Sequence, residues 1–195
     1  MRVPTLPTLP DLPTAAGRAA HEIGLAGLLG GNLFGRLALH PAVENISDKS
    51  ERGKVINAAW RRYGTVNSVS LLLVTGGWVA ARLGETRDNR LSPRERTLAR
   101  TKDGLVAAVT LTGLATAAEG VRFARQAPDG AVPMETGSEP AAETPASAAR
   151  SKRILNVLGA TGAVTEMALV AVNAGLAQEN FRRPPARRTL RRRSR

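Results

Sequence analysis

The sequence contains no cysteine and only 2 histidines, and aromatic residues make up 3% of its 195 positions. Without cysteine there is no disulfide framework, no thiolate metal site and no cysteine nucleophile. Two histidines are too few for a histidine-rich metal cage, so we expect neither a metal ion nor another cofactor. Aromatic side chains supply much of the buried area of soluble cores, so their scarcity argues against a core of that kind.

Familiar catalytic signatures are missing as well. The chain has no glycine-rich phosphate-binding loop that ends in lysine, no G-x-S-x-G and no H-E-x-x-H. These absences argue against P-loop nucleotide hydrolases, serine hydrolases with a nucleophile elbow and zinc peptidases with that helical motif.

Four long apolar runs dominate what the chain does contain. They carry almost no charge on any side and are rich in Gly, Ala, Ser and Thr, which let helix backbones approach closely in lipid. Crossing the hydrocarbon takes roughly 17–25 mainly apolar residues. Mean hydropathy is only −0.15 because polar segments separate the runs. The sequence therefore predicts an all-α fold, a four-helix transmembrane bundle with spans at about 22–40, 64–83, 104–121 and 154–178.

The segments around these spans suggest a domain organisation. Residues 1–14 carry four prolines and are predicted to form a disordered arm before a four-span domain at 15–181. Residues 126–149 are poor in bulky apolar side chains, which predicts a disordered loop on the outer side. A basic tail follows at 182–195.

Two helix starts can be predicted from the polar segments. The stretch before the second span favours a short helix over residues 48–62, which ends at the aromatic pair Trp60 and Tyr63. Those two rings suit an interfacial anchor. Ser92, Pro93 and Glu95 form a capping box with proline at the first helical position, so the third helix is expected to begin near Ser92.

The distribution of basic residues predicts the orientation. With four spans both termini lie on one side, and that side carries 17 Lys and Arg against 10 on the other. Basic residues favour the cytoplasmic side. We therefore expect a multi-pass protein of the cell membrane with both termini in the cytoplasm.

Polar residues recur at a regular spacing inside the first span. Asn32, Arg36 and His40 follow one another at intervals of four, which places them on one helical face. Arg36 lies roughly 20 Å along its helix and Glu119 roughly 22 Å along the third span, so the two charges fall at a matching depth. A charge in the membrane tends to face a partner. The sequence therefore predicts an ion pair between Arg36 and Glu119.

Other polar residues are expected to join this cluster. Asn67 and Asn156 fall near the outer boundary, and Glu166 falls nearer the midplane on the same stripe as Asn156. The group is either a set of packing contacts or a functional pocket. In a pocket, His40 and Glu166 are the candidate catalytic residues; otherwise His40 ends the helix before Pro41.

The tail favours binding to anionic lipid headgroups on the cytoplasmic side. Binding to nucleic acid is not expected, because no recognition motif or stacking aromatic residue accompanies the charge. The residues assigned to headgroup binding are Arg182, Arg183, Arg187, Arg188, Arg191, Arg192 and Arg193.

One short pattern resembles a known family. The first span ends in His40-Pro41-Ala42, and the loop before the second span ends in Trp60-x-x-Tyr63. Over about residues 23–81 this resembles the small four-span membrane proteins related to anthrone oxygenases. The resemblance implies oxidation of a polycyclic aromatic without metal or flavin, and it adds Trp60 and Tyr63 to His40 as candidate catalytic positions. The family's proline-asparagine motif near the later spans is absent, and the third span ends in RFARQAPDG.

These observations lead to one favoured function and three alternatives. We expect a small multi-pass membrane protein that acts as an assembly partner, as a homo-oligomer or beside another membrane protein. The alternatives are an anthrone-oxygenase-like enzyme, a transporter or channel subunit that uses Glu166 as a proton site, and a soluble nucleic-acid-binding bundle.

Overall fold

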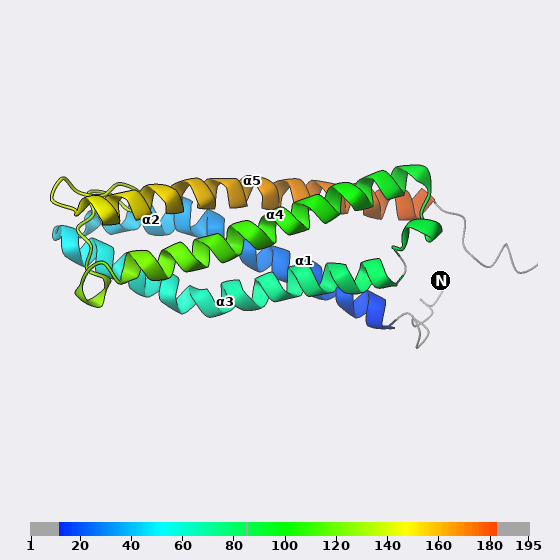
Figure 1. Ribbon diagram of the computed structural model, residues 1–195, viewed down its shortest axis with the longest axis horizontal. Helices are drawn as coiled ribbons and strands as arrows, with labels where there is room; N and C mark the ends of the chain where they lie inside the picture. Colours follow the sequence, from blue (N-terminus) through cyan, green and yellow to red (C-terminus); the bar gives the residue numbers. More distant parts are fainter. Residues whose placement is uncertain (1–11, 85, 183–195) are drawn as a thin grey trace, which may run out of the picture.

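The protein is a bundle of four long helices that lie side by side, and both ends of the folded chain lie at the same end of the bundle (Figure 1). The structure is a computed structural model that describes residues 12–84 and 86–182. The prediction of an all-helical fold is confirmed in this part of the chain, where the only β pairing is a single bridge between Met134 and Pro140. Of the predicted arm and tail, only residues 12–14 and 182 fall within the described residues, and they belong to helices.

The first of the four helical rods spans residues 12–45 and changes from an α-helix to a π-helix part of the way along. Helix α1, Leu12–Phe34, runs directly into a π-helical segment, Gly35–Leu39, and then into the short α2, His40–Ala42. A 3₁₀ turn, Val43–Asn45, ends the rod. A π turn holds more residues than an α turn, and such turns are frequent at functional sites. Arg36, the arginine inside the first predicted span, lies in this π-helical segment.

Helix α3, Lys49–Leu83, is a single helix of 35 residues. The sequence predicts a short helix over residues 48–62 and a separate span, and the structure shows that the two are continuous through Gly64. Asp48 caps the helix by accepting a hydrogen bond from the Glu51 amide at 2.8 Å. At about 1.5 Å per residue the helix is roughly 50 Å long, and the hydrocarbon core is about 30 Å thick. Several turns therefore extend beyond a membrane.

Helix α4, Pro93–Ala124, and helix α5, Ala146–Arg182, complete the bundle. The predicted capping box is confirmed, because the Ser92 hydroxyl accepts from the Glu95 amide and the Glu95 carboxylate accepts from the Ser92 amide. Helix α1 packs mainly on α3, and α4 mainly on α5. Among the described residues, α3, α4 and α5 are long and apolar enough to cross a membrane.

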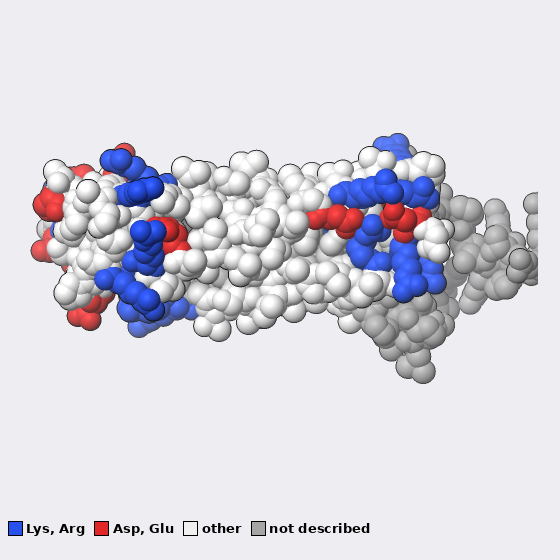
Figure 2. All heavy atoms as spheres, viewed as in Figure 1, with Lys and Arg blue, Asp and Glu red and all other residues white. Residues whose placement is uncertain are grey.

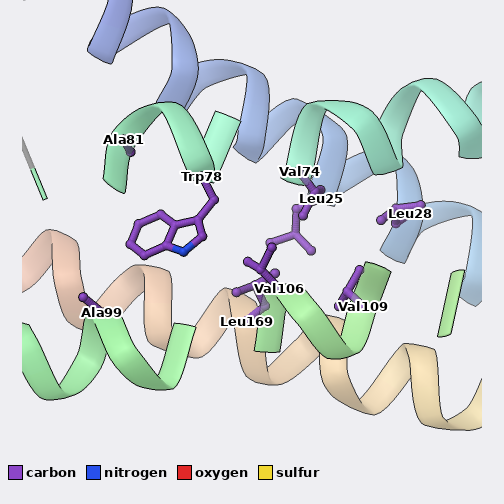
Figure 3. Close-up of a cluster of buried hydrophobic side chains, with 9 residues drawn as sticks. All are labelled: Leu25, Leu28, Val74, Trp78, Ala81, Ala99, Val106, Val109 and Leu169. Carbon is purple, nitrogen blue, oxygen red and sulfur yellow. The ribbon is translucent and has the colours of Figure 1, made fainter. Parts of the chain in front are cut away.

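The bundle has a hydrophobic core that is drawn from all four helical rods and is shown in Figure 3. Its largest member is Trp78 of α3, and it includes Leu25 of α1 and Leu169 of α5. Large apolar side chains also cover the outside of the bundle, including Leu37, Leu72 and Leu111. An outside as apolar as the inside is typical of a protein in lipid.

Residues 126–145 form an ordered cap over one end of the bundle, which corrects the prediction that residues 126–149 are disordered. Val132, Met134 and Ala141 are buried in the cap, and the Met134 amide donates to the carbonyl of Lys49 at 2.9 Å. An ion pair of 2.6 Å joins Lys49 to Glu135. The composition is too poor for an independent core, but the cap packs its few apolar residues against Ile56 and Phe123 of the helices. Helix α5 begins at Ala146, inside the predicted loop.

Candidate functional site

A row of polar contacts joins the first helical rod to α5. Asn32 donates from Nδ2 to the carbonyl of Gly159 at 3.1 Å and to Oε2 of Glu166 at 3.4 Å. Arg36 donates from Nε to Oδ1 of Asn32 at 3.2 Å and from Nη2 to the carbonyl of Asn156 at 3.0 Å. We call this row, together with His40 and Lys152 at its cap end, the polar seam.

The polar seam continues into the cap at one end of the bundle. Nδ1 of His40 lies 3.1 Å from Oγ of Ser138, and the Asn156 side chain donates to the Ser138 carbonyl at 2.8 Å. Gly137 lies against the backbone of His40, where any side chain would collide. Ser138 therefore contacts both helices of the seam and closes its cap end.

The aromatic residues of the sequence pattern lie beside His40. The ring centroids of His40 and Trp60 are 6.2 Å apart, and those of Trp60 and Tyr63 are 6.3 Å apart, both in edge-to-face geometry. The structure thus brings the three candidate positions together. Trp60 and Tyr63 point toward the first rod, where the hydroxyl of Tyr63 donates to the Gly27 carbonyl at 2.8 Å.

The glycines of the first span provide the space for these rings. A Cβ atom on Gly31 would overlap the Tyr63 ring, and one on Gly35 would overlap the Trp60 ring. A Cβ atom on Gly27 would overlap the side chain of Ser70. Gly27, Gly31 and Gly35 therefore serve the packing between the first rod and α3 within one chain.

The predicted ion pair between Arg36 and Glu119 is wrong. Within the described residues, Glu119 pairs only with Arg122, one turn further along α4, at 3.9 Å, and its Oε1 atom is buried without a hydrogen bond. Arg36 bonds to Asn32 and Asn156 instead. A matching depth does not fix the direction in which a side chain faces, and Arg36 faces α5.

Asn67 also lies outside the polar seam. In the part of the chain that the structure describes, its side chain makes no hydrogen bond, and it belongs to α3, whereas the seam joins the first rod to α5. The predicted cluster therefore keeps Asn32, Arg36, Asn156, Glu166 and His40 and loses two members.

Sequence reasoning missed Lys152. Its side chain is only 4% exposed, although it lies outside the predicted span, two residues before residue 154. Burial, with a smaller effect from the charge of Arg36, lowers the pKa of Lys152 to about 8. The available signal was its spacing: Lys152 precedes Asn156 by four residues and so shares its helical face.

A second polar cluster lies at the opposite end of the bundle, and its members bond to one another across the helices. The ammonium group of Lys102 lies 4.2 Å from the ring centroid of Trp78, whose indole donates to Asp103 at 2.8 Å. Arg82 pairs with Asp103 at 3.1 Å and with Asp88 at 2.9 Å. These contacts join α3 to α4 at the level where α3 ends.

His21 packs beside this second cluster. Its Nδ1 atom lies 2.7 Å from the Val74 carbonyl and its ring centroid lies 6.3 Å from that of Trp78. The ring is buried. Across residues 12–84 and 86–182, no three acidic or histidine side chains gather closely enough to hold a metal ion.

Comparisons with protein-family models, with curated proteins and with solved structures found no match to this chain. The case for a function therefore rests on the geometry and the charge distribution of the bundle.

Proposed function

We propose that this chain is a four-span integral protein of the cell membrane, with both termini in the cytoplasm, that acts by binding or assembly. The observation that carries this proposal is the distribution of charge. Charged side chains gather at the two ends of the bundle, and the face between them in Figure 2 carries none. A charge-free belt between two charged ends is what a bilayer requires of a helical protein.

The first rod is proposed as the fourth span, beside α3, α4 and α5. It lies along α3 through the same belt, and its outward residues Ile23, Phe34 and Leu37 are exposed and apolar. The guanidinium group of Arg36 faces α5, where it donates to the Asn156 carbonyl. Charged residues within spans normally face the bundle interior in this way.

The proposed binding role is supported by a firmly packed bundle and an ordered cap. Asn32, Arg36 and Asn156 are engaged with one another and with helix carbonyls, so they hold the two helix pairs together. A polar network of this kind supports a defined packing of the helices. The ordered cap then presents a fixed surface outside the membrane.

An alkaline-carbonate wash of membranes from expressing cells tests the integral character. We expect the protein in the pellet, because the apolar outside of the bundle requires lipid. Recovery in the supernatant would overturn the proposal and would favour a soluble bundle.

Photo-crosslinking tests the assembly role. A crosslinking residue in place of exposed Leu72 should give a discrete product of fixed mass, either a dimer or a complex with one partner. A monomer alone would count against assembly.

An oxidase related to the anthrone oxygenases is the second candidate, and the grouping of His40, Trp60 and Tyr63 favours it. Purified protein would then consume oxygen with an anthrone-type substrate, and His40→Ala would abolish the uptake. The matched control is His21→Ala, which changes the other histidine, at the far end of the bundle. No uptake by the native protein would exclude this candidate.

A further inference from the structure

Lys152 is a largely buried lysine without a counter-ion among the described residues. Within the described residues its ammonium group makes no hydrogen bond and no ion pair, although its side chain is only 4% exposed. The charge that acts on it, that of Arg36, has the same sign. A buried charge costs several kcal/mol unless it is paired, so native proteins rarely keep one alone.

The neighbours of Lys152 do not supply the missing negative charge. Arg36 itself donates only to uncharged oxygen atoms. Glu166 follows Lys152 by 14 residues on one continuous helix, about 21 Å away along the axis, so it lies too far along the seam to pair with it. Glu119 pairs with Arg122. Within the described residues neither Lys152 nor Arg36 forms an ion pair, and Glu135 of the cap pairs with Lys49, so the cap end of the polar seam holds two cations without a paired carboxylate.

One fully buried polar atom at this end also lacks a partner. Nε2 of His40 is buried without a hydrogen bond, while Nδ1 of the same ring lies against Ser138. Asn156, one turn after Lys152, donates to the backbone of that same Ser138. His40 and Asn156 thus meet at Ser138, Arg36 bonds to the Asn156 backbone, and Lys152 lies one turn before Asn156 on the same helical face. Lys152 and His40 both have unused hydrogen-bonding capacity.

We infer that this end of the polar seam binds an oxyanion of the phosphate class, held by Lys152, Arg36 and His40 beneath Ser138. Ammonium and guanidinium groups together make strong, charge-assisted hydrogen bonds to phosphate oxygens. Lys152 lies just before the predicted span, at the level where lipid phosphates are found, so the phosphate can belong to a lipid headgroup or to a free solute. The inference goes beyond the proposed function and does not depend on the direction in which the chain crosses the membrane.

The test measures the thermal unfolding midpoint of the full-length protein in a neutral detergent, with inorganic phosphate added at constant ionic strength. Lys152→Met is compared with Lys54→Met, a control at an exposed lysine at the same end of the bundle. Phosphate should raise the midpoint of the native protein and of the control. In Lys152→Met the apparent Kd for phosphate should rise by on the order of tenfold or more.

The direction in which Lys152→Met shifts the unfolding midpoint without phosphate separates a binding site from a structural contact. Without phosphate, Lys152→Met should unfold at a higher temperature than the native protein, because an apolar side chain replaces a largely buried lysine that has no counter-ion. A lower midpoint, together with an unchanged response to phosphate, would show that Lys152 bonds within the protein and would overturn the inference. Should Lys152→Met fail to fold, Arg36→Gln must weaken phosphate binding, and an unchanged response would refute the site.

Lipid nanodiscs distinguish the two sources of phosphate. Stabilisation by phosphatidylglycerol over phosphatidylcholine, lost in Lys152→Met, would assign the site to a lipid headgroup. Stabilisation by inorganic phosphate in detergent would assign it to a free solute. If neither ligand separates Lys152→Met from the native protein, there is no such site. A failed carbonate wash would leave the detergent arm of this test intact, so the two proposals fail separately.

Discussion

The guanidinium group of Arg36 donates a hydrogen bond to the backbone carbonyl of Asn156 at 3.0 Å. This contact fixes a charged side chain of the π-helical segment on the backbone of α5. A carbonyl oxygen has two lone pairs, so it can accept this bond beside its helical one. The bond connects the helix pair α1 and α3 to the pair α4 and α5.

The first prediction concerns the packing of α1 on α3. Gly31→Ala should destabilise the protein by about 1–3 kcal/mol, because the added methyl group overlaps the Tyr63 ring. Its neighbour Gly30 has open space around it, and Gly30→Ala should be neutral or slightly stabilising. Unfolding midpoints in detergent measure both. Equal effects of the two substitutions would contradict this packing.

A second prediction tests whether the cap is attached through α3. Gly53→Ala should loosen the cap, because its Cβ atom would collide with the Val132 carbonyl. Gly64→Ala on the same helix meets nothing and is the control. A glutamate-specific protease should cleave the cap, at Glu135, Glu139 or Glu143, faster only in Gly53→Ala. Rapid cleavage of the native protein at these residues would show that the cap is disordered after all.

The third prediction separates the observed seam from the ion pair that the sequence suggests. Arg36→Ala and Glu119→Ala should have additive effects on stability, within about 0.5 kcal/mol, because the two side chains share no contact. Asn32→Ala and Arg36→Ala should fall short of additivity, since Asn32 accepts a hydrogen bond from Arg36 at 3.2 Å. Coupling between Arg36 and Glu119 in a double-mutant cycle would restore the ion pair.

A fourth prediction follows from the lowered pKa of Lys152. Its pKa is about 8 in the folded protein and near 10.5 when unfolded. Between these values the unfolded chain binds more protons, so in phosphate-free buffer stability should rise from pH 8 to about 10.5. Lys102, two residues before the third predicted span, has its pKa lowered by burial to about 8 and acts in the same direction.

The contribution of each lysine can be separated by substitution. Lys152→Met and Lys102→Met should each remove part of the rise, and the double variant most of it. Chemical unfolding as a function of pH measures the slope. A slope that is the same in the native protein and the double variant would contradict the burial of these two charges.

Much of the architecture is predictable because it depends on local pattern. Four apolar runs give four helical rods, and the capping box at Ser92 marks a helix start within one residue. The face shared by Asn32, Arg36 and His40 is also predictable from spacing alone. The direction in which that face points is not, because rotation of one helix against the others depends on packing partners such as Gly159 and Tyr63.

The cap escapes prediction for a different physical reason. Composition predicts whether a segment can fold by itself, and residues 126–145 cannot. Val132 and Met134 are buried because helix ends distant in sequence supply the rest of the core. Lys152 escapes because a charge outside an apolar run is normally solvated, whereas Lys152 is buried in the folded bundle.

Labelling of single-cysteine variants tests the four-span membrane account most directly, because the chain has no cysteine of its own. Leu72, which is 74% exposed on the apolar belt, is replaced by cysteine in one variant, and Asn89 and Glu139 at the two ends in others. With a membrane-impermeant maleimide, we predict labelling of Glu139→Cys in intact cells, of Asn89→Cys only after permeabilisation, and of Leu72→Cys in neither case. Full labelling of Leu72→Cys in permeabilised cells would place the belt in water and contradict the account.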